Sequence, residues 1–408
     1  MIVAIGCDGR HVFDSTRAPE IRLVQGLAEG ATAELVVFPC SQHRRYEHLA
    51  STTLPEPLVA RIRQGSAGIL LDSSLEGVPH KPDVTAALHG LLERWRVPPA
   101  RCVFLTQDRQ YDANYRAHCE AIGLEPVAVL THDYWMWDAL NRYAESGEEA
   151  YAERLAAFRA RPFRRERTFV SLNRTPRPTK ILFLLRLLED GLWSRGFISF
   201  GGFRTGPTGP GKPRPTPEHL TTSLPGFADL VAQLAPQLDT LAGYGRVLFG
   251  LERHGWRRLE LGDSGLAAHF EEMDRSWFTA VTETEMRAAP SRITEKVLKP
   301  LVNFHPLVLF GNPGGLAMIR DYGFATFDPL IDESYDRELD PRRRFDLAYA
   351  ELVRLCRLSE DELSRWESAL AERLIFNARW GLTRFPTVFR ERCDGALVDR
   401  IRLRVLAR

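Results

Sequence analysis

The stretch from Pro290 to Gly315, PSRITEKVLKPLVNFHPLVLFGNPGG, constrains the fold of this chain more than any other. Proline and serine at 290–291 are typical of a helix start, with Ser291 as the N-cap. Residues 307–310 form a short apolar run, which is typical of a strand buried on both faces. A glycine-rich loop follows, and a second helix is predicted from about 316 to 322. This order of elements predicts an α/β unit that presents a loop and a helix start at the carboxyl edge of its sheet.

The first of these predicted helices is amphipathic. At about 100° per residue, its apolar side chains share one arc: Ile293, Val297, Leu298, Leu301 and Val302. Its charged side chains share the opposite arc: Arg292, Glu295, Lys296 and Lys299. These charges begin in the first turn, where unpaired N–H groups and the helix dipole favour an anion. Two interpretations remain open, a phosphate-binding helix start and a solvated helix with a Glu295–Lys299 surface pair.

Residues 293–311 resemble a known donor-binding segment. Ile293-Thr-Glu-Lys296, then a helix, then Pro306-Leu-Val-Leu-Phe-Gly311 is similar to the corresponding segment of the α-1,3-fucosyltransferases. The family has a tyrosine where this chain has Arg292. The resemblance implies a GT-B glycosyltransferase, in which Glu295 and Lys296 engage the sugar and the diphosphate of the donor. More distantly, the segment resembles uncharacterised bacterial and phage glycosyltransferases.

Length, charge and cysteine usage limit the class of protein. A chain of 408 residues predicts two or three domains, and a net charge of +1 gives no overall attraction to nucleic acid or membrane. The six cysteines show no CxxC spacing, so we expect free thiols in a reducing compartment and no zinc site. The N-terminal MIVAIGCDGR has the pattern of a first strand, not of a signal peptide. No apolar run reaches the length of a membrane span, and we expect a cytoplasmic protein.

The first third of the chain alternates strand and helix. Strands are predicted at 2–6, 34–38, 68–72, 102–106 and 126–131. Helices are predicted at about 18–28, 55–64, 82–95 and 111–122. Strands separated by helical patterns indicate βαβ units and a parallel sheet.

Polar residues follow the predicted strands, at the edge where ligands of such sheets bind. They are Asp8, Ser41-Gln42-His43, Asp72-Ser73-Ser74, Thr106-Gln107-Asp108 and His132-Asp133-Tyr134. We interpret this edge as the acceptor side of a glycosyltransferase, with Asp72, Glu76, Asp108 and Asp133 as candidate bases. Each residue taken alone also fits a loop turn or a helix cap.

A second α/β unit is predicted after residue 166. A charged helical stretch, 136–166, ends in the basic run ARPFRRER, which fits a solvated helix end or a phosphate or nucleic-acid patch. A strand at 168–172 then leads to a loop with Asn173, Arg174 and Arg177, and to an apolar helix at 180–190. In the fucosyltransferases the second domain opens in a similar way, and Arg174 and Lys180 occupy the matching positions. Basic groups at a helix start suit a diphosphate.

The remaining segments are predicted as follows. Strands are expected at 197–200, Trp277–Thr282 and Gly323–Phe327, and helices near 224–242. The Gly/Pro-rich segment 204–217 is expected to be a mobile surface loop. Asp332, beyond the last strand, suits either a sugar or ribose hydroxyl or a turn. The tail is helical at about 344–356, 359–378 and 392–406, with a Ser359–Glu362 capping box, and its last helix is expected to pack on the first domain.

We therefore predict an α/β, GT-B-like protein with two Rossmann-like domains whose parallel sheets face a central cleft. The predicted domains are an acceptor domain at 1–166, a donor domain at 167–375 and a helical tail at 376–408. The predicted catalytic residues are Glu295, Lys296, Asp72 and Asp133. The predicted donor-binding residues are Asn173, Arg174, Lys180, Arg292, Gly311, Gly314 and Asp332.

The predicted activity is the transfer of a hexosyl or fucosyl group from a nucleotide sugar to an acceptor hydroxyl, with inversion and without a metal. No cofactor is expected besides the nucleotide sugar, which is a co-substrate. The acceptor is left open among a glycan, a small molecule and modified nucleic acid. A transferase acting on modified bases would need a basic groove, which Arg161, Arg164, Arg165 and Arg167 would begin. A non-catalytic module that binds nucleotide sugars is the third interpretation.

Overall fold

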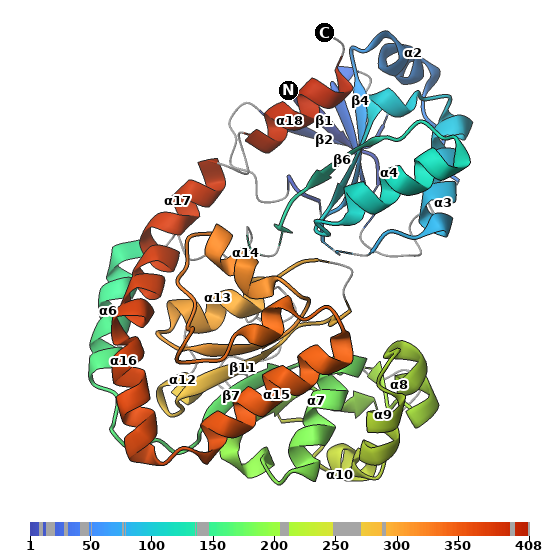
Figure 1. The fold of residues 1–408 in the computed structure, drawn as a ribbon. Helices are drawn as coiled ribbons and strands as arrows, with labels where there is room; N and C mark the ends of the chain where they lie inside the picture. Colours follow the sequence, from blue (N-terminus) through green and yellow to red (C-terminus); the bar gives the residue numbers. More distant parts are fainter. Residues whose placement is uncertain are drawn as a thin grey trace. The chain divides into compact units, whose positions relative to one another are not determined.

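A computed structural model describes the chain in ranges separated by gaps. They are residues 1–7, 11–13, 21–27, 32–40, 49, 51–75, 77, 79–134, 136, 147–204, 212–247, 271–287, 291–391 and 396–406. The chain forms two compact units (Figure 1). Unit 1 comprises Met1–Asn141, Ala289–Arg292 and Thr387–Arg408, and unit 2 comprises Arg142–Ala288 and Ile293–Pro386. This division differs from the predicted boundaries, because residues 166 and 375 both lie inside unit 2.

Unit 1 contains a six-stranded parallel sheet with the order β2-β1-β3-β4-β5-β6. Its strands are β1 (Ile2–Ile5), β2 (Arg22–Gln25), β3 (Leu35–Pro39), β4 (Gly68–Ser73), β5 (Cys102–Thr106) and β6 (Ala128–Thr131). Its helices are α2 (Glu56–Gln64), α3 (Pro82–Trp95), η2 (Pro99–Arg101), α4 (Tyr111–Ile122) and α18 (Ala396–Val405), and α17 (Phe385–Arg390) spans the division between the units.

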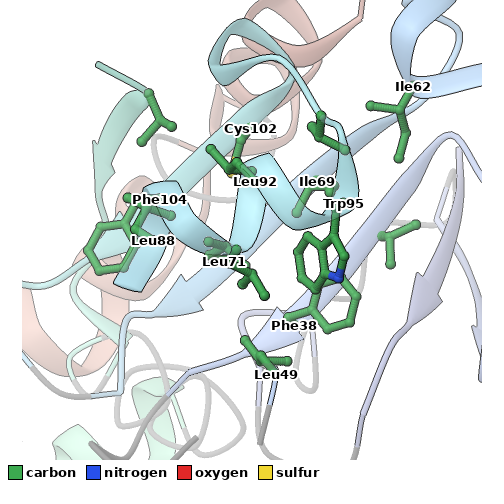
Figure 2. Close-up of a cluster of buried hydrophobic side chains, with 14 of the residues drawn as sticks. Phe38, Leu49, Ile62, Ile69, Leu71, Leu88, Leu92, Trp95, Cys102 and Phe104 are labelled. Carbon is green, nitrogen blue, oxygen red and sulfur yellow. The ribbon is translucent and has the colours of Figure 1, made fainter. Parts of the chain in front are cut away.

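Both faces of this sheet are buried, as the apolar runs in its strands require. On β3, Val36 and Phe38 face one apolar cluster, while Leu35 and Val37 face the other. Helices α2, α3 and α4 cover the first cluster, where the rings of Phe38 and Trp95 stack 4.8 Å apart (Figure 2). Helix α18 covers the second cluster and lies beside β4 (Figure 1). The expectation that the last helix packs on the first domain is therefore confirmed.

One predicted helix of unit 1 is wrong. Residues 22–25, inside the helix expected at 18–28, form β2, which pairs with β1 from Ile2↔Arg22 to Ile5↔Gln25. The backbone groups on that side of β1 need hydrogen-bond partners, and this pairing overrides the local pattern. The side chains of β2 are mostly exposed, as expected at a sheet edge.

Unit 2 contains a four-stranded parallel sheet with the order β12-β11-β7-β8. Its strands are β7 (Phe169–Asn173), β8 (Gly196–Phe200), β11 (Phe278–Thr282) and β12 (Leu307–Phe310), with a separate pair β9 (Phe203–Arg204) and β10 (Lys212–Pro213). Its first helices are α6 (Gly147–Arg159), α7 (Pro178–Glu189), η3 (Trp193–Arg195), α8 (Pro217–Ser223), α9 (Ala228–Leu234) and α10 (Gln237–Gly243). The later ones are α12 (Glu271–Asp274), α13 (Glu295–Val302), α14 (Gly315–Asp321), η4 (Ser334–Arg337), α15 (Pro341–Arg357), α16 (Glu360–Arg379) and the π-helical η5 (Trp380–Arg384).

Several predicted elements of unit 2 are confirmed, including the buried strand β12, the strand β11 and the Ser359–Glu362 capping box of α16. The start of the helix that was predicted from Ser291 is wrong. Helix α13 begins at Glu295, and Thr294 is its N-cap. Of the loop expected at 204–217, residues 205–211 lie outside the described residues.

The predicted strand Gly323–Phe327 is also wrong, because side chains take the place of a neighbouring strand. The Ala325 amide donates to Asn377 Oδ1 at 2.8 Å, and Asn377 Nδ2 donates to the Ala325 carbonyl at 2.8 Å. The Phe327 amide donates to Glu333 Oε1. Because these backbone groups already have hydrogen-bond partners, the extended segment is stable without pairing to a strand of the sheet.

Replacing Asn377, which is fully buried, should be costly. Asn377→Ala leaves the half-buried amide and carbonyl of Ala325 without their partner, so we expect the free energy of unfolding to fall by about 1–3 kcal/mol. Urea unfolding measures this. Glu372→Ala, at an exposed site on the same helix, is the control and should change it by less than about 0.5 kcal/mol. Equal effects of the two variants would contradict this account.

Candidate anion site at the carboxyl edge of the second sheet

The order in which successive strands are added to the sheet of unit 2 reverses at β7. From β7 the chain proceeds to β8 on one side, and β11 and β12 then lie on the other side. Ligands of open α/β sheets bind beyond the carboxyl ends of the strands at such a switch point. In the described residues, the backbone register of these strands covers Phe169↔Phe278 and Val170↔Thr279. Towards the carboxyl ends, side chains connect the strands instead.

Two side-chain hydrogen bonds make this connection. Ser171 Oγ donates to the Ala280 carbonyl at 2.9 Å, and Thr282 Oγ1 donates to Asn173 Oδ1 at 2.6 Å. Asn173 Nδ2 donates in turn to Ser171 Oγ at 2.9 Å. Asn173 is completely buried, so the structure makes it a residue that joins the strands, whereas the sequence predicted a donor contact.

Beyond β11, the carboxylate of Glu283 organises the start of α13. It accepts hydrogen bonds from the Thr294 amide at 3.0 Å and from Thr294 Oγ1 at 2.8 and 2.9 Å. Lys296 Nζ donates to Glu283 Oε2 at 3.2 Å and to Thr294 Oγ1 at 2.7 Å. Glu295 Oε1 lies 3.8 Å from the same ammonium group. The predicted residues Glu295 and Lys296 are thus brought together at the switch point.

Two further lysines are buried near this network. Lys180, in the first turn of α7, is 4% exposed, and Lys299 of α13 is 8% exposed. Lys299 therefore does not form the surface pair with Glu295 that the sequence left open. The ammonium group of Lys180 makes no hydrogen bond or ion pair within the part of the chain that the structure describes. We call Lys180, Lys296, Lys299 and Arg174 the cationic cluster.

The pKa values of the two buried lysines show how strongly their surroundings oppose a charge. Burial, followed by repulsion from Lys296, lowers the pKa of Lys180 to about 7. Burial lowers the pKa of Lys299 to about 8, although Glu295 opposes the shift. Arg174 is exposed, and its charge also lowers the pKa of Lys299. Among the described residues, the cationic cluster has four basic side chains near two carboxylates, Glu283 and Glu295, where two helices begin. Such an arrangement suits an anion.

The glycine loop serves a different purpose from the predicted one. Gly314 has a left-handed backbone (φ 75°) and precedes α14, but Asp336 already occupies that helix start. Its carboxylate accepts from the amides of Leu316 and Ala317 at 2.8 and 3.1 Å. The carbonyl of Gly311 accepts from the buried Arg344 at 3.0 Å. The structure therefore gives Gly311 and Gly314 a role in the turn, and an internal carboxylate takes the place that the sequence assigned to the donor.

Asp332 lies in a turn of its own. Its side chain accepts from the Ser334 amide at 2.9 Å, and this bond lowers the pKa of Asp332. Its own amide donates to Glu351 of α15 at 3.1 Å. In the structure Asp332 is therefore a turn residue, one of the two roles that the sequence allowed; the other was binding of a sugar or ribose hydroxyl.

The polar residues at the carboxyl edge of the unit 1 sheet are largely buried. Asp72 accepts from the Val12 amide and from the amide and hydroxyl of Ser74, and burial raises its pKa. Asp133 pairs with Arg109 at 3.3 Å. Of the other predicted residues here, Asp8, residues 41–43 and Glu76 lie outside the described residues.

Asp108 and the segment before α13 meet in unit 1. Asp108 Oδ1 accepts from the amides of Ser291 and Gln110 at 2.8 and 3.0 Å, while the Arg109 amide donates to the Ser291 carbonyl at 3.0 Å. Asp108 Oδ2 has no hydrogen bond to any described residue. Arg292 lies near Asp108 and helps to hold its pKa down, although burial raises it overall. Arg292 thus belongs to unit 1, and not to the charged face of α13 as predicted.

The basic run before β7 is used inside unit 2. Arg161 donates to Asp274 and to the carbonyls of Asn303 and Phe304. Arg165 donates to Glu367 and lies over the ring of Trp277. Both side chains are at most 4% exposed, so they cannot begin a groove for nucleic acid.

Glu283 and Lys299 are the members of the site that the sequence did not assign. Glu283 directly follows a predicted strand, which is where a residue of a ligand site is expected. Two other polar residues come next in the sequence, and the sequence alone does not distinguish Glu283 from them. Lys299 lay on the charged arc of the predicted helix, and only packing shows that it is buried. Among the described helices we find none with the length and apolar character that a membrane crossing requires.

Comparisons with known proteins give little further information. No protein-family model and no curated protein matches the chain. Among solved structures, it is similar to the α,α-trehalose 6-phosphate synthase from Burkholderia multivorans, with 13% identity and a TM-score of 0.37 over 92% of this chain and 73% of that chain. A similarity at this TM-score carries no argument about what this chain does.

The buried charge of Lys180 should reduce stability in a pH-dependent way. Its pKa is about 7 in the folded state, against the ordinary 10.5. The unfolded chain therefore holds more protons between these values, and stability rises with pH across this window. We expect Lys180→Met to raise the free energy of unfolding by at most about 5 kcal/mol at pH 6 and about 2 kcal/mol at pH 9.

Urea unfolding at the two pH values tests this expectation. Lys212→Met, at an exposed lysine of β10, is the matched control and should show no such pH dependence. The same gain for Lys180→Met at pH 6 and pH 9 would contradict the assignment of the shifted pKa to Lys180.

Proposed function

We propose that the protein is a glycosyltransferase that uses a nucleoside-diphosphate sugar, and that unit 2 binds the donor diphosphate at the cationic cluster. The observation that carries this proposal is the burial of Lys180, without a partner among the described residues, beside Lys296 and Lys299 at the switch point of a parallel sheet. A buried charge without a counter-ion is costly unless a ligand supplies one. The resemblance of residues 293–311 to the fucosyltransferase donor segment supports the same chemistry.

The proposed reaction is an inverting displacement at the anomeric carbon. The acceptor oxygen forms a bond to this carbon while the bond to the diphosphate oxygen breaks, and the acceptor proton passes to a base. The departing diphosphate gains one negative charge in this step. The cationic cluster would stabilise that charge, and Glu295 would hold sugar hydroxyls. A hexosyl or fucosyl group fits this scheme equally well.

Among the candidate bases, Asp72 is the least available, because its carboxylate oxygens already accept hydrogen bonds from Val12 or Ser74. Asp133 pairs with Arg109. Asp108 keeps one oxygen without a hydrogen bond to the described residues, and burial raises its pKa. A base works best when its pKa lies near the operating pH, and burial raises the pKa of Asp72, Asp108 and Asp133 alike.

The two alternatives fare differently. A transferase that acts on bases in nucleic acid would need a basic groove, and the internal contacts of Arg161 and Arg165 remove half of the residues proposed for it. A non-catalytic module that binds nucleotide sugars would use the same cationic cluster. Release of free nucleoside diphosphate from a nucleotide sugar separates the enzyme from the module.

Substitutions in the cationic cluster test the proposal. Arg174 is exposed and has no ion pair in the described residues, so Arg174→Ala should leave stability unchanged and weaken nucleoside-diphosphate binding roughly ten- to a hundredfold. Lys296→Ala should weaken binding by a similar factor and also reduce stability, because buried Glu283 loses a partner. Glu295→Ala should weaken binding of the intact nucleotide sugar but not of the bare diphosphate.

Calorimetric titration of each variant with nucleotide sugars and with their diphosphates provides the measurement. Arg357→Ala, at another exposed arginine of unit 2, is the control for a general loss of positive charge. A thermal-shift screen first identifies the nucleoside, since a ligand at one hundred times its Kd adds roughly 2.7 kcal/mol of stability. If Arg174→Ala and Lys296→Ala bind every nucleoside diphosphate as the wild type does, the proposed donor site is wrong.

A further inference from the structure

Burial is the main influence that disfavours the protonated form of Lys180, and charges of both signs lie near it. Lys296 and Lys299 of α13 repel its ammonium form, while Glu283 and Glu295 attract it. Arg174, which follows β7, adds positive charge near Lys299. Glu283 already accepts hydrogen bonds from Thr294 and Lys296. Glu283 and Glu295 both contact Lys296, and neither makes a hydrogen bond or ion pair with Lys180 in the described part of the chain.

The acidic residues of the other elements packed against α7 have partners elsewhere. Helix α15 contacts α7 through Tyr349 and Arg186, and its Asp346 and Glu351 pair with Arg342 and Arg354. Helices α9 and α10 carry the exposed Asp229 and Asp239, which pair with Arg342 at 2.6 Å and with Arg214 at 2.8 Å. Segment η3 carries Arg195, which donates to the carbonyl of Cys356 at 2.8 Å. Within the described residues, the charge balance around Lys180 thus depends on what occupies the cationic cluster.

We propose that Lys180 takes up a proton from solvent when a nucleoside diphosphate binds at the cationic cluster, so that binding and protonation are coupled. This inference rests on the proposed function and adds a property that a simple diphosphate site lacks. The ammonium form of Lys180 would then be in place before the sugar bond breaks. When the nucleoside diphosphate leaves, the proton leaves Lys180 as well, and the site returns to its initial charge.

The physical reason is electrostatic. Without ligand, burial and two neighbouring ammonium groups hold the pKa of Lys180 near 7. A bound diphosphate carries two or more negative charges and shifts the balance towards the ammonium form. By linkage, the ligand binds the protonated site more tightly, so affinity should fall up to about tenfold per pH unit above pH 7, until the pH reaches the raised pKa of the complex.

Calorimetry in buffers with different ionisation enthalpies counts the protons. GDP, UDP, ADP and CDP are titrated into the full chain at pH 8 in Tris and in EPPS, where the terminal phosphate, with a pKa of about 6, no longer titrates. We expect the wild type to take up about one more proton per bound ligand than Lys180→Gln or Lys180→Arg. Lys180→Arg keeps its charge at every pH, so its affinity should not show the fall above pH 7.

Two controls separate other sources of protons. Lys299→Arg removes the contribution of the second buried lysine, and the part that depends on Lys180 should persist. Lys212→Gln, at an exposed lysine, should behave as the wild type does. Binding with equal proton uptake in the wild type, Lys180→Gln and Lys180→Arg would overturn this inference and leave the donor site intact. If none of the four nucleotides binds, the proposed function itself is overturned.

Discussion

The carboxylate of Glu283 is the group on which the candidate site depends. It follows β11 directly, and it holds both the amide and the hydroxyl of Thr294. Thr294 in turn begins α13, so one buried side chain fixes where this helix starts. The same carboxylate receives the ammonium group of Lys296. A charged hydrogen bond in a buried setting is strong only when its geometry is complete, and here the strand end and the helix start together complete it.

Around this carboxylate, the structure collects more positive charge than it neutralises. Lys180 comes from α7, Lys299 comes from α13, and both are buried at a cost that their lowered pKa values record. Folding alone gives no reason to keep such groups, since apolar residues of the same size would be more stable there. Lys180, which has no ion pair among the described residues and lies near a switch point, is the feature that the proposed donor site would explain.

Several other charged residues have partners within the protein. Asp336 caps α14, Arg344 holds the carbonyl of Gly311, and Arg161 and Arg165 bind backbone carbonyls and acidic side chains. The glycine loop and the arginine run had been candidate ligand sites in the sequence, because the same residue types occur in structural and in ligand-binding roles. These charged side chains have partners in the described residues and are structural, whereas Lys180 has none there and is a candidate functional residue.

The sequence by itself determined the parallel α/β architecture and most strand positions, because alternating apolar runs and helical periods are local signals. It could not determine that Arg22–Gln25 pairs with β1, or that Asn377 replaces a strand beside Ala325. Nor could it show which carboxylates already accept hydrogen bonds. Glu283 accepts from the Thr294 amide, and Asp336 accepts from the Leu316 amide, only in the folded chain. The tertiary structure decided these points because hydrogen-bond partners and burial depend on segments far apart in the chain.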